Sequence, residues 1–285
     1  MPSNPSQTVR HRRLSAELKR LREEAGVTVD RAAEALGSYR TKIHRIERGE
    51  WKRLKEADIR TLAHLYGVTD PAKQDALVAM AKQAKDKGWW VRYSDVLGPG
   101  TYISLEAEAS AIRFYSGMLV PGLLQTPDYA KAVIVGSGTA DEAVVERRLE
   151  ARLMRQKILT QNDRPQIHTI VDEAALCRMV GGTETMRAQL HHLARLNEQG
   201  IAEIQVLTNT AGAHQAMTGQ FIILDFESPD QSPVVFIDIS LDGLLMEEPH
   251  DIERYKTKYD SLRQTALSPK DSNAYLVRLT ARLDG

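Results

Sequence analysis

The chain has 285 residues, a length that favours two packed units over one. Its hydrophobic fraction of 42% and charged fraction of 27% are those of a globular protein, which excludes a disordered or fibrous chain. The net charge is zero, but residues 1–87 hold 19 basic and 12 acidic side chains (+7), and residues 88–285 hold 19 and 26 (−7), an asymmetry expected when one unit faces a polyanion.

The single cysteine, Cys177, excludes an intrachain disulfide and a multi-cysteine metal site, and its apolar neighbours predict a buried thiol. No apolar run approaches the roughly 20 residues that span a bilayer, and the polar, basic residues 1–13 contain no apolar stretch. We therefore expect a cytoplasmic protein without a membrane partner.

The N-terminal third is predicted to be a small helical domain. Residues 1–13 are rich in Ser, Pro, Asn and Arg, which predicts a disordered basic arm. Over residues 14–80, apolar residues recur at helical spacing and are interrupted by Gly26, Gly37, Gly49 and Gly67, which predicts short helices of about ten residues joined by tight turns. Residues 81–102 begin Lys-rich and end at a Gly-Pro-Gly triplet, so we place the domain junction there. Its aromatic cluster (Trp89, Trp90, Tyr93) is expected to pack between the domains, the alternative being a stacking platform.

Residues 103–285 are predicted to form a larger effector domain. The patterns predict helices over 105–113, 126–135, 142–160, 183–199 and 250–283, with a short one after Asp172. They predict strands over 166–171, 204–207, 220–226 and 234–239. Helices around few strands indicate an α+β domain, and the hairpin-like spacing of the last strands favours a small antiparallel sheet.

The segment from Thr28 to Arg48 carries the most information about function. Thr28 can cap one helix, Ala33 is small enough for a second helix to cross closely, and Gly37 can supply the positive φ of a short turn. Ser38 is expected to cap the second helix, whose buried residues would be Ile43 and Ile46. This spacing is typical of a helix-turn-helix, whose second helix enters the DNA major groove.

The outer face of the second helix carries residues that can donate to phosphates and bases. They are Tyr39, Arg40, Thr41, Lys42, His44, Arg45 and Arg48. The alternative is a helical hairpin with a solvated basic face. Because the small, glycine and isoleucine positions fit together with this face, we favour binding to duplex DNA.

At these residues the chain resembles the XRE-type helix-turn-helix family, which includes phage repressors and has a lambda-repressor-like fold. The resemblance covers residues 14–80, with LREEAGVT at 21–28 and KIHRIERG at 42–49. It implies a structural ion pair between Arg22 and Glu47. It also implies base contacts from Tyr39, Arg40, Thr41 and Arg45, and phosphate contacts from Lys42, His44, Arg48, Lys52, Arg53 and Lys55. Val29 departs from the family pattern, because many members place a DNA-contacting Gln there.

The remaining two thirds resemble the C-terminal effector domain of actinobacterial WhiJ-like and antitoxin-like regulators. The matching stretches are 105–133, 148–159, 171–182 and 266–272 (ALSPKDS). Such regulators are commonly encoded beside a small partner protein. The resemblance therefore implies a small partner here, and repression or autoregulation as the mode of action.

The stretch VPGLLQTPDYA, residues 120–130, has two interpretations. Thr126 and Pro127 form a helix start, and capping explains most of the pattern. The alternative is a groove for a ligand or partner peptide with Tyr115, Leu124, Gln125 and Tyr129 on its wall.

Enzyme motifs are absent from the sequence. It has no His-Glu-x-x-His, no Gly-x-Ser-x-Gly, no phosphate-binding Gly-Lys-Ser/Thr loop and no complete dinucleotide fingerprint. His191 and His192 are adjacent and would point to different faces of a helix, and His168 and His214 lack nearby partners in sequence. We therefore expect no catalytic residues, no metal and no cofactor.

Three functional hypotheses follow. The first is a nucleoid-associated, homodimeric transcriptional regulator that reads an inverted repeat in duplex DNA. The second is an antitoxin-like interaction protein that mainly masks a small partner. The third is a regulator that senses a small molecule in its C-terminal domain.

Overall fold

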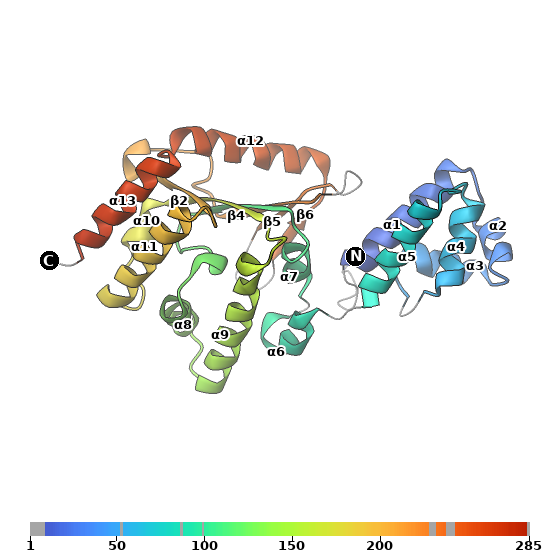
Figure 1. Ribbon diagram of the computed structural model, residues 1–285, viewed down its shortest axis with the longest axis horizontal. Coiled ribbons are helices and arrows are strands. Elements are labelled where there is room, and N and C mark those ends of the chain that lie inside the picture. Colours follow the sequence, from blue (N-terminus) through green and yellow to red (C-terminus); the bar gives the residue numbers. More distant parts are fainter. Residues whose placement is uncertain are drawn as a thin grey trace. The chain divides into compact units, whose positions relative to one another are not determined.

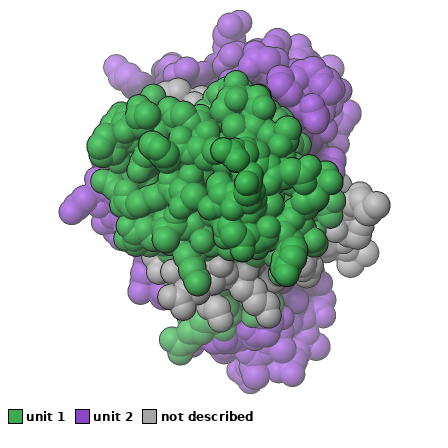
Figure 2. Space-filling model, turned by 90° about the vertical axis from the view of Figure 1, so that its right-hand side faces the viewer, with its two compact units in different colours: residues 1–94, 99–104 green, residues 95–98, 105–285 purple. Residues whose placement is uncertain are grey.

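The computed structural model describes residues 9–51, 54–85, 88–98, 100–227, 232–237 and 243–283 (Figure 1). The chain divides into two compact units, residues 1–94 with 99–104 and residues 95–98 with 105–285 (Figure 2). The division falls around the Gly-Pro-Gly triplet at 98–100.

The first unit is helical throughout its described part. Its helices are α1 (Val9–Glu24), α2 (Val29–Ala35), α3 (Arg40–Glu47), α4 (Glu56–Leu65) and α5 (Pro71–Lys85), followed by a 3₁₀ helix (Trp89–Tyr93). Helix α1 begins five residues before the predicted start at residue 14, so the C-terminal part of the expected disordered arm is helical. Residues 1–8 of that arm lie outside the described residues.

The core of the first unit draws buried residues from all five helices α1 to α5. Leu14 and Leu18 of α1, Ile43 of α3, and Ile59 and Leu62 of α4 are almost completely buried. Burying such aliphatic side chains contributes about 1.5–3 kcal/mol each. Because α3 supplies its apolar face to this core, its opposite face is left for solvent.

The second unit contains the strands, with helices before, between and after them. In chain order they are α6 (Ser94–Leu97), which begins at the boundary, α7 (Thr101–Glu106), which crosses it, β1 (Ala111–Ser116), α8 (Pro127–Gly136), α9 (Glu142–Gln156), β2 (Gln166–Asp172), α10 (Glu173–Cys177), α11 (Thr183–Glu198), β3 (Glu203–Leu207), β4 (Phe221–Asp225), β5 (Val234–Ile237), β6 (Leu244–Met246), α12 (Pro249–Thr265) and α13 (Pro269–Ala281).

The sheet corrects the predicted small antiparallel one. It has six strands in the order β3-β2-β1-β4-β5-β6. The pairs β1–β2 and β2–β3 are parallel, with Ile112 opposite Ile167, whereas β1–β4, β4–β5 and β5–β6 are antiparallel. Helices connect β1 to β2 and β2 to β3, which is the crossover that parallel neighbours require.

The parallel half was missed because β1 was predicted to be helical. Leu105, Ala109 and Ile112 are spaced as on one face of a helix, and the segment over 105–113 was assigned to one. In the structure α7 ends at Glu106 and β1 begins at Ala111. Strand β1 lies between β2 and β4, so its tertiary neighbours override the local pattern. Strand β6 was also not predicted.

Helices cover the two faces of the sheet. Helix α12 lies along one face, and α8, α9 and α11 lie on the other (Figure 1). On the α12 side, Ile252, Tyr259 and Leu262 pack with Ile170 and Ile223 of the strands. Burial on both faces explains why the central strands are apolar with little alternation.

Candidate nucleic-acid interface

Helices α2 and α3 form the helix-turn-helix. Thr28 caps α2, since its Oγ1 accepts a hydrogen bond from the Arg31 amide at 3.2 Å. Ala33 is 4% exposed at the crossing, and Gly37 adopts a φ of +55° in the turn. A β-carbon disfavours this left-handed conformation, so glycine suits the position.

The start of the recognition helix differs from the prediction. Helix α3 begins at Arg40, and Tyr39 occupies the N-cap position without a side-chain cap. Ser38, predicted to be the cap, lies one residue too early. Tyr39 is 84% exposed, and Ile43 and Ile46 are buried on the opposite side of the helix. The first turn of α3 therefore presents an exposed ring beside uncapped amides.

Arg22 and Glu47 tie α1 to the end of α3. Arg22 Nε lies 2.5 Å from Glu47 Oε1 and Nη2 lies 3.3 Å from Oε2, while Nη1 donates to the carbonyl of Val27 at 3.0 Å. The two side chains are 11% and 9% exposed. The hydrogen bond to Glu47 raises the pKa of Arg22 above its ordinary value. This geometry suits a structural brace that fixes α3 relative to α1.

A second buried polar contact supports the turn after α3. The indole Nε1 of Trp51 donates to Ser15 Oγ at 3.0 Å, and Trp51 is 8% exposed. Arg45 donates from Nε and Nη2 to the carbonyl of Glu50 at 3.3 and 3.1 Å. The segment leaving α3 is therefore held from both its buried and its exposed side.

The predicted DNA-contacting residues differ in exposure and in whether they contact another part of the first unit. Tyr39, Thr41 and Arg48 are exposed, and His44 is half-buried. Lys42 lies 2.9 Å from Asp58 of α4, so its ammonium is directed toward the protein. Arg40 forms an exposed ion pair with Asp30 of α2, and Arg45 braces the turn. Lys55 is exposed, and Lys52 and Arg53 lie outside the described residues.

The sequence interpretation missed the acidic partners of these cations. Asp30 and Asp58 precede and follow α3 by ten or more positions, and such pairs have no short-range signature. Asp30 also stands in the first turn of α2, where its carboxylate suits the helix dipole, so its position alone does not point to a partner on α3.

The residues proposed as a groove wall in the second unit are buried. Tyr115 is 3% exposed, Leu124 and Tyr129 are 0% and Gln125 is 4%. The hydroxyl of Tyr129 accepts the Val120 amide at 3.2 Å. These side chains pack inside the unit and do not line an open groove.

Three side chains fasten the loop that the VPGLLQTPDYA stretch forms. Gln189 of α11, completely buried, donates to the Leu124 carbonyl and accepts from the Thr126 amide, both at 2.7 Å. Gln156 of α9 donates to the Gln125 carbonyl at 2.8 Å, and Arg152 donates to the Gln125 side chain at 2.7 Å. Thr126 caps α8. The geometry supports the structural interpretation of this stretch.

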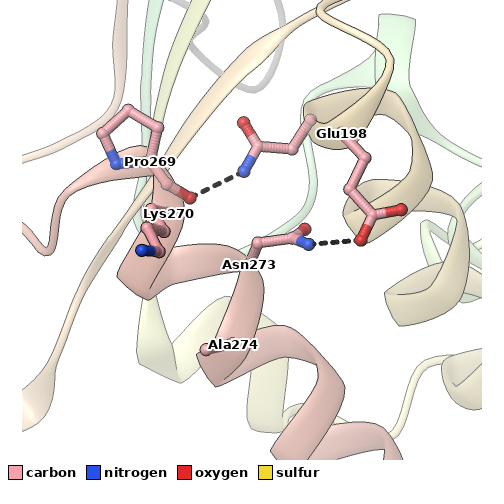
Figure 3. A pocket seen from close by; sticks show the side chains of 6 residues that line it. Glu198, Pro269, Lys270, Asn273 and Ala274 are labelled. Atoms are coloured by element: carbon pink, nitrogen blue, oxygen red, sulfur yellow. Dashed lines mark hydrogen bonds between the residues drawn. The ribbon is translucent and has the colours of Figure 1, made fainter.

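The ALSPKDS segment at 266–272 covers the outer edge of β3. The Leu267 amide donates to the Val206 carbonyl, and the Val206 amide donates to Ser272 Oγ, both at 2.9 Å. Unpaired edge strands invite aggregation, and this segment satisfies the edge. Beside it is a hollow between α11 and α13 where Glu198 and Asn273 point toward each other, 2.8 Å apart (Figure 3). Asn197 also donates to the Pro269 carbonyl at 2.8 Å, so these bonds hold α11 against α13.

Several smaller predictions change. Cys177 is exposed, contrary to the expected buried thiol. His168 lies 3.5 Å from Glu203, and His214 lies 3.6 Å from Asp172, so both histidines have carboxylate neighbours that the sequence did not reveal. In the described part of the chain, no three or more His, Cys, Asp or Glu side chains are arranged to hold a metal ion. Among the same residues, no helix is long and apolar enough to cross a membrane.

Comparison with known families agrees with the two-part architecture. Residues 13–77 match the family described as Helix-turn-helix domain, so the first unit is a helix-turn-helix domain, the module of DNA-binding regulators. Residues 99–278, which are 180 of the 285, match the Domain of unknown function (DUF5753). The chain belongs to this DUF5753 family. No curated protein and no solved structure matches the chain.

Proposed function

We propose that the protein is a sequence-specific transcriptional regulator that inserts α3 into the major groove of duplex DNA. The observation that carries the proposal is the exposed face of α3, where Tyr39, Arg40 and Thr41 lie at the N-terminal end of a helix whose other side is buried. In helix-turn-helix proteins this end of the recognition helix meets the base edges. Arg48 and Lys55 supply phosphate contacts nearby.

The proposal includes a homodimer on an inverted repeat, acting in the nucleoid as a repressor or autoregulator. Two half-sites multiply the base readout of a single module, and two-fold protein symmetry matches a palindromic operator. Resemblance to WhiJ-like and antitoxin-like regulators supports a second unit that receives its signal from a small partner protein. We further propose that the protein acts without catalysis.

Two rival functions make different predictions. The same resemblance supports an antitoxin-like interaction protein, in which masking a small partner is the main activity and DNA binding is autoregulatory. Co-purification of a small protein in stoichiometric amount would favour this role. A small-molecule sensor would instead be stabilised against heat by its metabolite.

The experiment that tests the proposal is a titration of labelled DNA from upstream of the protein's own coding region. Binding is measured by fluorescence anisotropy against excess random duplex at several salt concentrations. Competitor-resistant binding that Arg40→Ala abolishes is the expected result, and the salt slope counts the phosphates contacted. Equal affinity of Arg40→Ala and wild type for the target would refute base reading by α3.

A further inference from the structure

The ion pair between Arg40 and Asp30 bridges the two helices of the helix-turn-helix. Arg40 is the first residue of α3, and Asp30 lies in the first turn of α2. Arg40 Nε lies 3.0 Å from Asp30 Oδ1, and the side chains are 66% and 64% exposed. The pair therefore lies on the solvent side of the motif, at the end of α3 that faces bases in our proposal.

The contact through Nε determines what the guanidinium can still do. Arginine carries five N–H donors, and the Asp30 carboxylate comes closest at Nε, so the two terminal nitrogens, Nη1 and Nη2, can still donate to another acceptor pair. Two parallel N–H groups match the O6 and N7 atoms of guanine. Arg45 differs, because its Nε and Nη2 both donate to the Glu50 carbonyl. Arg40 is thus the arginine of α3 whose terminal fork is better placed to read a base.

We infer that Asp30 is a positioning residue that orients Arg40 for a bidentate contact with one guanine in each half-site. This inference rests on the proposed DNA-binding function. In the free protein the pair is exposed and contributes little to stability. On DNA, water is displaced around it, and the attraction between the carboxylate and the guanidinium strengthens as the local dielectric falls. Asp30 therefore acts on base preference, although it touches no base in this scheme.

Two other roles for Asp30 make different predictions. If it only stabilises α2 through the helix dipole, its loss lowers thermal stability and leaves base preference unchanged. If it only repels phosphate, its loss raises the affinity for every sequence equally. A positioning role alone changes the preference at one base position.

The test compares full-length variants on one duplex library with a randomised core, sequencing the bound fraction. The variants are Asp30→Asn, Arg40→Lys, the double variant, and Glu34→Gln as a matched control. Glu34 is on the same helix, is similarly exposed (70%) and pairs with Arg31, so its substitution removes the same charge without touching α3. Thermal unfolding of each variant verifies folding.

A guanine position that Arg40→Lys erases is expected in the wild-type profile. A bidentate arginine discriminates against other bases by about 5- to 150-fold. Asp30→Asn should lower that preference by about fivefold, Glu34→Gln should leave it unchanged, and Asp30→Asn should add nothing to Arg40→Lys. Asp30→Glu, which keeps the carboxylate, should recover part of the preference.

The inference is overturned if Asp30→Asn keeps the wild-type guanine preference, or if it raises affinity for all sequences alike. It is also overturned if the effect persists in the Arg40→Lys background, because the two residues would then act independently. A wild-type profile without any enriched sequence would refute the proposed function itself, a result distinct from enriched binding that does not depend on Asp30.

Discussion

The Arg22–Glu47 brace predicts that the first unit loses much of its stability when one partner is removed. Removing one side of a buried ion pair costs about 3–5 kcal/mol, because the other charge is left without compensation. Here both side chains keep about a tenth of their exposure and Arg22 retains the Val27 carbonyl, so the expected loss for Glu47→Ala is about 2–3 kcal/mol. For a unit of this size the loss corresponds to a fall in Tm of about 10 to 20 °C.

The tryptophans provide an assay specific to this unit. All three, Trp51, Trp89 and Trp90, lie in the first unit, so urea unfolding followed by their fluorescence reports on it within the full-length protein. The matched control is Glu34→Ala, which breaks the exposed Arg31–Glu34 pair (65% and 70% exposed) and should change the free energy of unfolding by no more than about 0.5 kcal/mol. Equal losses for the two variants would show that the brace is not a structural element.

Three further predictions concern the turn, the sheet edge and the DNA-facing cations. Gly37→Ala should lower the free energy of unfolding by about 1–2 kcal/mol in the same urea assay, because φ is +55°. No neighbouring atom would crowd the added β-carbon, so the loss comes from the backbone conformation alone. Gly37→Asn should lose less, and equal losses for the two variants would contradict this argument. Ser272→Ala should destabilise the second unit by about 1–3 kcal/mol, because the Val206 amide loses its acceptor at the sheet edge. Urea unfolding followed by far-UV circular dichroism measures the loss, and an unchanged unfolding midpoint would count against the role of that bond. Arg48→Ala should reduce the salt slope of DNA binding by about one, whereas Lys42→Ala should reduce it less because its ammonium is paired with α4; the reverse order would mean that this pair opens on DNA.

Local patterns predicted most of the helices and the motif that supports the function. The helix-turn-helix could be recognised because its constraints are short-range: a cap at Thr28, a small residue at Ala33, a turn at Gly37 and a buried face at Ile43 lie within one segment. The helices around residues 127–136, 142–156 and 183–198 were predicted for the same reason, since periodicity and capping act over a few residues.

The tertiary structure alone decided the features that depend on distant residues. Strand β1 takes its conformation from β2 and β4 on either side, against a helical local pattern, and this placement creates the parallel half of the sheet. Burial of Tyr115 and Leu124 likewise depends on packing with segments far along the chain, so a sequence pattern could not separate a groove from a core.

The chemistry of the candidate interface divides in the same way. The amino-acid sequence by itself determined that α3 presents a row of cations, because helical periodicity assigns each residue to a face. Only the folded chain decided which cations are directed to the protein and which to solvent, because Asp30 and Asp58 reach α3 from other helices. Ion pairs across a fold depend on where helices cross, and that geometry is a property of the whole packed unit.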